Sequence, residues 1–342
     1  MQPLQGQVAL VAGATRGAGR AIARELAAAG ATVYATGRST RPHAATPGRP
    51  ETIEETAELI AAAGGTAVAI QVDHADEAQV QALAARIRTE AGRLDILVND
   101  IWGGDDLVSW GQPFWTQDMA VARELVDRAV MSHWLTARHC APIMVEANRG
   151  LIVEVTDGAS AGYRSNLLYD FTKAAAIRLA YAMAWDLART GVTALAVSPG
   201  FIRSEAMLER FGVTEATWRD AAKDNPDFAW SETPHYLGRA IAALAADPDV
   251  RRKAGAAFFV GDLADGYGFT DLDGSQPHFN RSAAAHLATE LAGDAKLSPF
   301  GRQLASSIYM RDAHLDPKRG DEARLLADRL GWRRLGQGLR PV

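Results

Sequence analysis

Between residue 7 and about residue 260, short apolar runs rich in β-branched residues alternate with longer alanine-rich segments of helical periodicity. Strands that are apolar on both faces are typical of a parallel sheet covered by helices on each side. The alternation therefore predicts one doubly wound α/β domain. Strands are expected near residues 7–12, 32–36, 66–72, 95–99, 151–155, 192–197 and 256–261, and helices near residues 17–29, 51–63, 76–91, 117–145, 167–190 and 233–246.

Three segments interrupt this alternation. Residues 39–50 form a loop with Pro, Gly and Arg, and residues 100–116 carry three tryptophans and one phenylalanine in a stretch too rich in glycine for a helix. Loops of that length are usually functional or disordered. Residues 283–342 are helical in pattern and end in the basic tail GWRRLGQGLRPV. We expect a main domain over 1–282 and a helical C-terminal extension over 283–342, packed on that domain or on a neighbouring subunit.

Composition and charge exclude several classes of protein. The formal net charge is −5 and the basic residues are scattered, so nucleic acid is not an expected partner. The single cysteine, Cys140, excludes an internal disulfide and fits a reducing compartment. The N-terminus has no charged and then apolar leader, and no run reaches the roughly 18 apolar residues of a membrane span. We therefore expect a soluble cytoplasmic protein without a membrane partner.

A glycine-rich turn follows the first expected strand directly and opens the first expected helix. In such a turn, backbone N–H groups and the positive end of the helix meet a pyrophosphate, while small residues allow close packing of helix on strand. The context of strand, turn and helix predicts a nucleotide site. The turn consists of Gly13, Ala14, Thr15, Arg16, Gly17, Ala18 and Gly19.

The end of the second expected strand indicates which nucleotide is bound. A site that prefers NAD places a carboxylate there to accept from the adenosine ribose, but this sequence has Gly37, Arg38 and Ser39. The guanidinium of Arg38 can face a 2′-phosphate, with Arg16 as a second cation beside it. The sequence therefore favours NADP(H) over NAD(H).

Tyr169 and Lys173 are four residues apart at the start of an expected helix, so their side chains share one helical face. A free phenol has a pKa near 10, and a cation about 5 Å away at an effective dielectric of about 20 stabilises the phenolate by roughly 3 kcal/mol. That amounts to about two pKa units. The pair is therefore a candidate proton-transfer device that works near neutral pH.

Together these motifs resemble the classical short-chain dehydrogenase/reductase family over about residues 5–280. The matching stretches are GATRGAG, LDILVN, Tyr169-x-x-x-Lys173 and VSPGFIRSE. YDFTK, SETPHYLGRAIAALAADPDV and DGYGFTDLDGS most resemble the dehydrogenase/reductase member 1 branch of that family. The resemblance implies a Rossmann fold of about seven strands and an NADPH-dependent oxidoreductase that acts on a carbonyl or alcohol.

The resemblance also implies roles for individual residues. Tyr169 would be the general acid, and Lys173 would lower its pKa and bind the nicotinamide ribose. Asp73 would accept from the adenine amino group, and Asn99 would line the cofactor channel. The nicotinamide end would be contacted by Pro199, Gly200, Ile202 and Ser204. Long helices near 117–145 and 167–190, similar to the family's assembly helices, favour a homo-oligomer, either a dimer or a tetramer.

The family's catalytic serine has no obvious counterpart in this sequence. Counting back thirteen residues from Tyr169 reaches Thr156, whereas aligning the end of the motif admits either Thr156 or Asp157. Neighbouring strand residues point to opposite faces, so only one of the two should face the cleft. We favour Thr156, whose hydroxyl can donate as a serine does, with Ser160 as a further alternative. An aspartate facing the phenol would oppose the effect of the lysine.

Three other residues depart from the family pattern. Asp100 replaces the second asparagine after the fourth strand, and Ala129 replaces the asparagine that holds a relay water. Glu154, inside a strand, would need a partner such as an arginine. Asp157, Asp100 and Ala129 together suggest a rival function, a cofactor-binding scaffold or sensor with lost or weak redox activity. A dehydratase or epimerase that uses the same Tyr/Lys pair is a third possibility.

Aromatic residues gather in the segments after the fourth, fifth and sixth expected strands, where doubly wound sheets bind ligands. They suggest an apolar or ring-containing carbonyl substrate, although each could also be a packing anchor. The histidines lack metal-ligand spacing, so no metal is expected. The aromatic candidates are Trp102, Trp110, Phe114, Trp115, Tyr163, Phe201, Trp218 and Trp230.

Overall fold

The computed structural model describes residues 2–158, 166–282, 332–335 and 338–341. Within them, seven parallel strands form one sheet in the order β3-β2-β1-β4-β5-β6-β7. This confirms the predicted doubly wound α/β domain. The strands are β1 (Val8–Ala12), β2 (Thr32–Gly37), β3 (Thr66–Gln71), β4 (Ile96–Asn99), β5 (Gly150–Val155), β6 (Val192–Ser198) and β7 (Ala257–Phe259).

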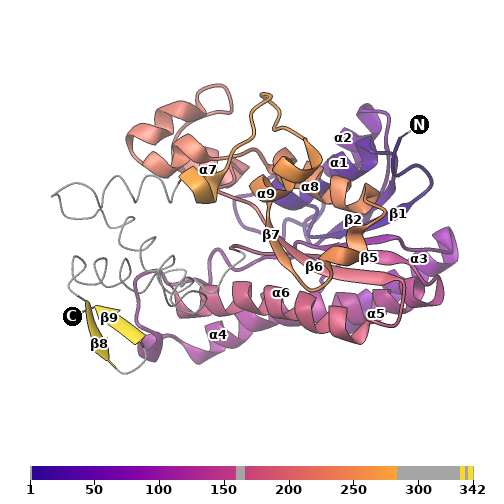
Figure 1. Cartoon of the computed structure of the whole chain (residues 1–342), viewed down its shortest axis with the longest axis horizontal. Helices are drawn as coiled ribbons and strands as arrows, with labels where there is room; N and C mark the ends of the chain where they lie inside the picture. Colours follow the sequence, from indigo (N-terminus) through magenta and orange to yellow (C-terminus); the bar gives the residue numbers. More distant parts are fainter. Residues whose placement is uncertain (1, 159–165, 283–331, 336–337, 342) are drawn as a thin grey trace.

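Helices cover both faces of this sheet (Figure 1). α1, α2, α8 and α9 lie on one face, and α3, α4, α5 and α6 lie on the other. Their bounds are α1 (Gly17–Ala28), α2 (Ile53–Ala62), α3 (Glu77–Ala91), α4 (Met119–Val126), α5 (Ser132–Glu146), α6 (Leu167–Asp186), α7 (Glu205–Arg210), α8 (Pro234–Ala246) and α9 (Val260–Tyr267).

Alternation along the strands divides the core into two layers. Ala9 and Val11 of β1 face α1 and α8, whereas Val8 and Leu10 face α3 and α5. Successive strand residues point to opposite faces, so a strand that is covered on both sides must be apolar at every position. All five residues of β1 are buried. This is why the strands could be located from apolar runs alone.

The structure corrects several element boundaries. The single helix predicted over 117–145 is two helices, α4 and α5, joined by a π-helical turn over Asp127–Met131. The last strand, predicted over 256–261, is only β7, because the chain turns into α9 at Val260. Neither α7 nor α9 was predicted. Both are short and follow strands, where apolar periodicity gives little signal.

The predicted extension over 283–342 lies outside the described residues, apart from one hairpin. Its strands are β8 (Trp332–Leu335) and β9 (Gly338–Pro341), which pair antiparallel. The boundary at residue 282 therefore stays a prediction. Among the described helices, none has the length and apolar character to cross a lipid bilayer.

Helices α5 and α6 expose four large aromatic side chains. Along α6, Phe171, Tyr181 and Trp185 are exposed, and Trp134 of α5 is exposed as well. The side chain of Trp185 is 69% accessible. Exposed large aromatic side chains are candidates for an interaction site where they form a contiguous patch.

Candidate active site

The main cleft opens at the carboxyl ends of β1, β4, β5 and β6, where the strand order reverses between β1 and β4. Ligands of doubly wound proteins bind at this switch point. The cleft has a volume of about 1010 Å³. Of the predicted site residues, it is lined by Gly13, Thr15, Arg16, Gly17, Ala18, Arg38, Asp73, Thr156, Tyr169, Lys173, Pro199, Gly200, Ile202 and Ser204.

The glycine turn between β1 and α1 has no room for side chains at two positions. A Cβ on Gly13 would lie 2.3 Å from the carbonyl oxygen of Asp100, and one on Gly19 would lie 2.2 Å from the carbonyl oxygen of Gly13. Gly13 also has a φ of +94°, which favours glycine. Gly19 therefore serves helix packing and does not line the cleft. The tight turn brings the N-terminus of α1 to the cleft, which Gly17 and Ala18 line, and a helix N-terminus is where a pyrophosphate binds favourably.

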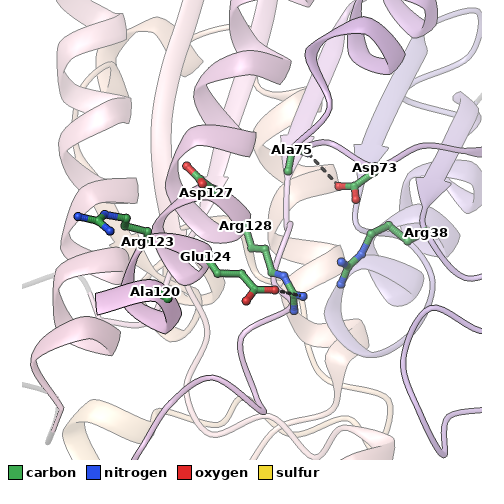
Figure 2. Close-up of a pocket in the computed structure, with 8 residues that line it drawn as sticks. All are labelled: Arg38, Asp73, Ala75, Ala120, Arg123, Glu124, Asp127 and Arg128. Atoms are coloured by element: carbon green, nitrogen blue, oxygen red, sulfur yellow. Dashed lines mark hydrogen bonds and ion pairs between the residues drawn. The ribbon is translucent and has the colours of Figure 1, made fainter. Parts of the chain in front are cut away.

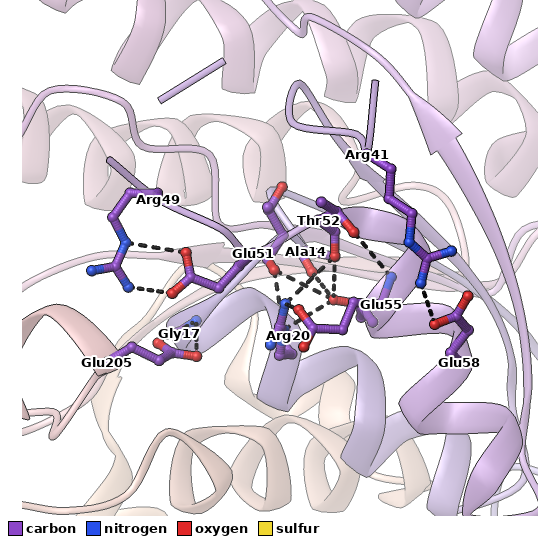
Figure 3. Close-up of polar contacts among 12 residues, drawn as sticks. Ala14, Gly17, Arg20, Arg41, Arg49, Glu51, Thr52, Glu55, Glu58 and Glu205 are labelled. Atoms are coloured by element: carbon purple, nitrogen blue, oxygen red, sulfur yellow. Dashed lines mark hydrogen bonds and ion pairs between the residues drawn. The ribbon is translucent and has the colours of Figure 1, made fainter. Parts of the chain in front are cut away.

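One backbone N–H group at the start of α1 already donates to a carboxylate of the protein (Figure 3). The backbone N–H of Gly17 donates to both carboxylate oxygens of Glu205, at 3.3 and 3.0 Å. The N-cap residue Arg16 gives α1 no side-chain cap. Glu205, which begins α7, takes that place, so the position accepts an anion. A pyrophosphate bound there would compete with Glu205, a residue that the sequence did not single out.

Ion pairs tie the loop over residues 39–50 to the rest of the cleft. Arg49 pairs with Glu51 and with Glu209 of α7, and the first pair is visible in Figure 3. Arg20 of α1 pairs with Glu55 of α2 at 2.6 Å. The loop and α7 are therefore held together on one side of the glycine turn.

Beyond the end of β2, a second cavity of about 520 Å³ shares residues with the main cleft (Figure 2). Arg38 and Asp73, which also line the main cleft, lie on one side of this cavity, and Arg128 lies on the other. Arg128 donates to the carbonyl oxygen of Gly103 at 2.7 Å and pairs with Glu124. Arg128 was not predicted from the sequence, because no local motif marks a helical arginine that meets a loop 25 residues away.

The predicted Tyr/Lys pair lies at the inner wall of the cleft. Asn166 caps α6 by accepting from the N–H groups of Leu168 and Tyr169, which fixes where the helix begins. The Lys173 ammonium lies 5.4 Å from the centre of the Tyr169 ring and 4.0 Å from the centre of a Trp102 ring. The cation is thus held beside the phenol by an aromatic face.

Asp157, and not Thr156, faces the phenol. The Tyr169 hydroxyl donates to Oδ2 of Asp157 at 2.8 Å. Thr156 is buried, and its hydroxyl donates to the backbone carbonyl of Lys173 at 2.7 Å. Contrary to the expectation, the Thr156 hydroxyl joins β5 to α6 in this structure and does not bond to the phenol, although Thr156 lines the cleft; its role as a donor to the substrate stays a prediction. The alternative donor Ser160 lies outside the described residues.

A buried polar network lies beneath the site. Glu154 accepts from the Asn99 amide at 2.7 Å and lies 2.5 Å from Nδ1 of His133, whose Nε2–H donates to the Ile101 carbonyl at 2.9 Å. The partner of Glu154, expected to be an arginine, is thus His133. Asn99, expected in the cofactor channel, is fully buried and does not line the cleft. Burial alone would lower the pKa of His133, but the charge of Glu154 and its hydrogen bond raise it overall.

The aromatic predictions divide into three groups. Trp102, Trp110 and Phe201 line the cleft, together with Phe279, which was not predicted. Phe114 and Trp115 are exposed outside it, whereas Trp218 packs in a small core with Phe228. Trp230 does not line the cleft either, and Tyr163 lies outside the described residues. Ala129 belongs to a small apolar cluster, and both Trp102 and Tyr169 pack against that cluster.

Asp100 directly follows β4, lines the cleft and is partly buried, and desolvation raises its pKa from 3.8 to about 7, against the opposing charges of Lys173 and His133. Between about pH 4 and pH 7, the native carboxyl holds a proton that the unfolded chain has released. Stability therefore falls as the pH rises through this window.

We expect Asp100→Asn to raise the melting temperature at pH 8 and to change it little at pH 4, because the amide has no charge to bury. Melting curves at both pH values measure this effect. Asp106→Asn, at an exposed position in the following loop, is the control and should show no such dependence. Equal effects of Asp100→Asn at the two pH values would contradict the assignment.

Comparisons with known proteins agree with this geometry. Residues 7–212 match the family described as short chain dehydrogenase. Dehydrogenase/reductase SDR family member 1 of Mus musculus is 35% identical over 277 residues, covering 80% of this chain and 85% of the relative. The Homo sapiens protein of the same name is 33% identical over 276 residues, covering 80% and 85%. 7alpha-hydroxysteroid dehydrogenase of Escherichia coli K12 is 31% identical over 205 residues, covering 60% and 74%.

Solved structures give the same result. A metagenomic short-chain oxidoreductase in complex with NADP aligns with a TM-score of 0.58 at 25% identity, over 75% of this chain and 97% of that one. Hydroxysteroid dehydrogenase from Escherichia coli aligns with a TM-score of 0.60 at 25% identity, over 75% and 95%. With the glycine turn, the Tyr/Lys pair and the seven-stranded sheet in place, the chain belongs to the classical short-chain dehydrogenase/reductase family, in the branch of member 1.

Proposed function

We propose that this oxidoreductase uses NADPH to interconvert a carbonyl compound and an alcohol, with Tyr169 as the general acid and base. The observation that carries the proposal is the Tyr169 hydroxyl at the inner wall of a cleft that the glycine turn and the segment 199–204 also line. The nicotinamide cofactor supplies or accepts the hydride. All other chemistry falls to the residues of the chain.

The phenol of Tyr169 donates its proton to the carbonyl oxygen during reduction and takes it back during oxidation. The Lys173 ammonium, 5.4 Å from the ring centre, favours the ionised phenol and so eases this transfer, whereas the Asp157 carboxylate at 2.8 Å opposes ionisation. Trp102 keeps the ammonium in place through the cation–π contact. Gly17 and Ala18 would hold the pyrophosphate, and Ser204 together with Ile202 would border the nicotinamide.

Preference for NADPH rests on Arg38 and Arg16. Both line the cleft, and no carboxylate follows β2 at the position where a ribose-binding acid would stand. The NADP bound to the metagenomic relative supports the same preference. Charge-assisted contacts from a guanidinium to a phosphate are among the stronger hydrogen bonds in proteins.

Replacing Arg38 tests this preference. We expect Arg38→Leu to weaken NADPH binding at least tenfold and NADH binding by less than threefold, because only NADPH has the phosphate that Arg38 would contact. Titration of cofactor fluorescence gives both dissociation constants. Arg41→Leu removes an exposed arginine three residues on and serves as the control. Equal weakening of both cofactors would contradict the assignment.

The walls of the cleft support an apolar or aromatic substrate. Trp102, Trp110, Phe201 and Phe279 line the same cleft as Tyr169, and the first two pack against its ring. Burial of ring systems against such walls is favourable, and a few polar groups then fix the orientation. The named activity of the hydroxysteroid dehydrogenase relatives, which act on ring compounds, is compatible with this class.

Tyr169→Phe tests the catalytic assignment. We expect NADPH consumption with a panel of apolar ketones to fall by 10²- to 10⁴-fold, because the proton donor is lost while the ring remains. NADPH binding should stay within twofold of the wild type. Tyr181→Phe, on the exposed face of the same helix, should keep full activity. A wild-type protein that binds NADPH and reduces no carbonyl would favour the rival scaffold function.

A homo-oligomer is the second part of the proposal, and its interface would be the apolar surface of α5 and α6. We expect the wild type to sediment as a dimer or tetramer and Trp134→Glu/Trp185→Glu to sediment as a monomer, because carboxylates cannot be buried there without a partner. Analytical ultracentrifugation measures both. Leu272→Glu, at another exposed apolar position, is the control. A monomeric wild type at micromolar concentration would refute the interface. The cytoplasmic location stays a prediction.

A further inference from the structure

The carboxylate at position 157 changes which substrates the site can hold. Asp157 follows β5, lines the cleft, and accepts the hydrogen of the Tyr169 hydroxyl at 2.8 Å. Resting on the function proposed above, we propose that Asp157 is a specificity-determining residue that selects carbonyl substrates with a hydroxyl group on the adjacent carbon. These are α-hydroxy ketones, and their reduction products are vicinal diols.

The phenol has one O–H, and in this structure it donates that hydrogen to Asp157. A ketone oxygen only accepts, so the phenol must turn its hydrogen from Asp157 to the ketone before the reaction. The carboxylate oxygen then loses a donor inside a half-buried cleft. Leaving such a charged acceptor without a replacement is costly.

An α-hydroxy ketone supplies the replacement. Its two oxygens are on neighbouring carbons, and the phenol oxygen and Oδ2 of Asp157 are neighbours at 2.8 Å. The phenol can donate to the ketone oxygen while the substrate hydroxyl donates to Asp157. A simple ketone makes only the first contact. A serine or threonine hydroxyl in this position could donate to either ketone, so the selectivity follows from the carboxylate.

Among the described residues, the two chain neighbours of Asp157 make their polar contacts elsewhere. Thr156 donates to the Lys173 carbonyl, and the backbone N–H of Gly158 donates to the Ser198 hydroxyl at 2.6 Å. The ring centres of Trp102 and Trp110 lie 5.6 and 5.1 Å from the centre of the Tyr169 ring, so both rings border the space beside the phenol. The predicted substrate therefore combines an aromatic or apolar body with the hydroxy ketone group.

The reaction balances with the cofactor of the proposed function. Hydride adds to the carbonyl carbon, the electron pair of the C=O bond takes the proton of Tyr169, and a proton from solvent restores the phenol. One hydroxy ketone, one NADPH and one proton give one vicinal diol and one NADP⁺. Asp157 gains and loses no proton overall.

A matched pair of probes tests the proposal. Acetophenone and 2-hydroxyacetophenone differ by one hydroxyl group, and NADPH absorbance reports the reduction of both. We expect the wild type to show at least a tenfold higher kcat/KM for the hydroxy ketone. Asp157→Ser should reduce this ratio to threefold or less, mainly by improving acetophenone. Asp157→Asn, which is nearly isosteric, provides a second variant if the serine variant does not fold.

Two further measurements separate this proposal from the proposed function. Cofactor titration must give the same NADPH affinity in all variants, and quenching of tryptophan fluorescence gives the affinity of each probe for the NADP⁺ complex. Asp106→Ser is the control, because that exposed carboxylate lies outside the cleft lining. Preferential binding of the hydroxy ketone without turnover would overturn the proposed function and keep the selectivity.

If the wild type reduces and binds 2-hydroxyacetophenone and acetophenone equally well, the selectivity is overturned and the proposed function stands. A ratio that Asp157→Ser leaves unchanged would also overturn the selectivity, and so would failure of both probes to bind.

Discussion

The glycine turn after β1 is wedged between the ends of two neighbouring strands, and the whole cleft depends on this contact. The N–H groups of Gly13 and Ala14 donate to the Thr36 carbonyl of β2, while Asp100, at the end of β4, donates its N–H to Ala12. The Asp100 carbonyl leaves no space for a Cβ on Gly13. Because the turn is pinned from both sides, α1 begins at a fixed position and its N–H groups face the cleft.

Beneath this cleft, the polar network of Asn99, His133 and Glu154 ties β4, β5 and α5 together. Buried charges are tolerated only where each has a partner, and Glu154 has both the imidazole and the Asn99 amide. The second ring nitrogen of His133 holds the Ile101 carbonyl. That contact fixes the start of the segment that carries Trp102, on which the Lys173 ammonium rests. The network thus positions the cation beside Tyr169 without touching the cleft.

Two carboxylates occupy places where ligand groups are expected to bind. Glu205 accepts from the N–H of Gly17 in the anion site, and Asp157 accepts from the Tyr169 hydroxyl at the reacting position. In both places the protein satisfies a donor with its own acid. A ligand must therefore make more favourable interactions than the carboxylate contact it replaces. This requirement applies at both ends of the cleft, so both ends contribute to selectivity.

The sequence by itself determined the sheet, the glycine turn and the Tyr/Lys pair, because apolar runs, tight turns and helical spacing are local and depend on residues close along the chain. Most of the residues that it predicted for the cofactor site line one cleft, and their roles there stay a prediction. Only the tertiary structure decided that Asp157 faces the phenol instead of Thr156, that His133 is the partner of Glu154, and that Arg128 and Glu205 belong to the site. Each of these outcomes joins side chains from different elements. Their geometry depends on how strands and helices pack, which no local pattern records.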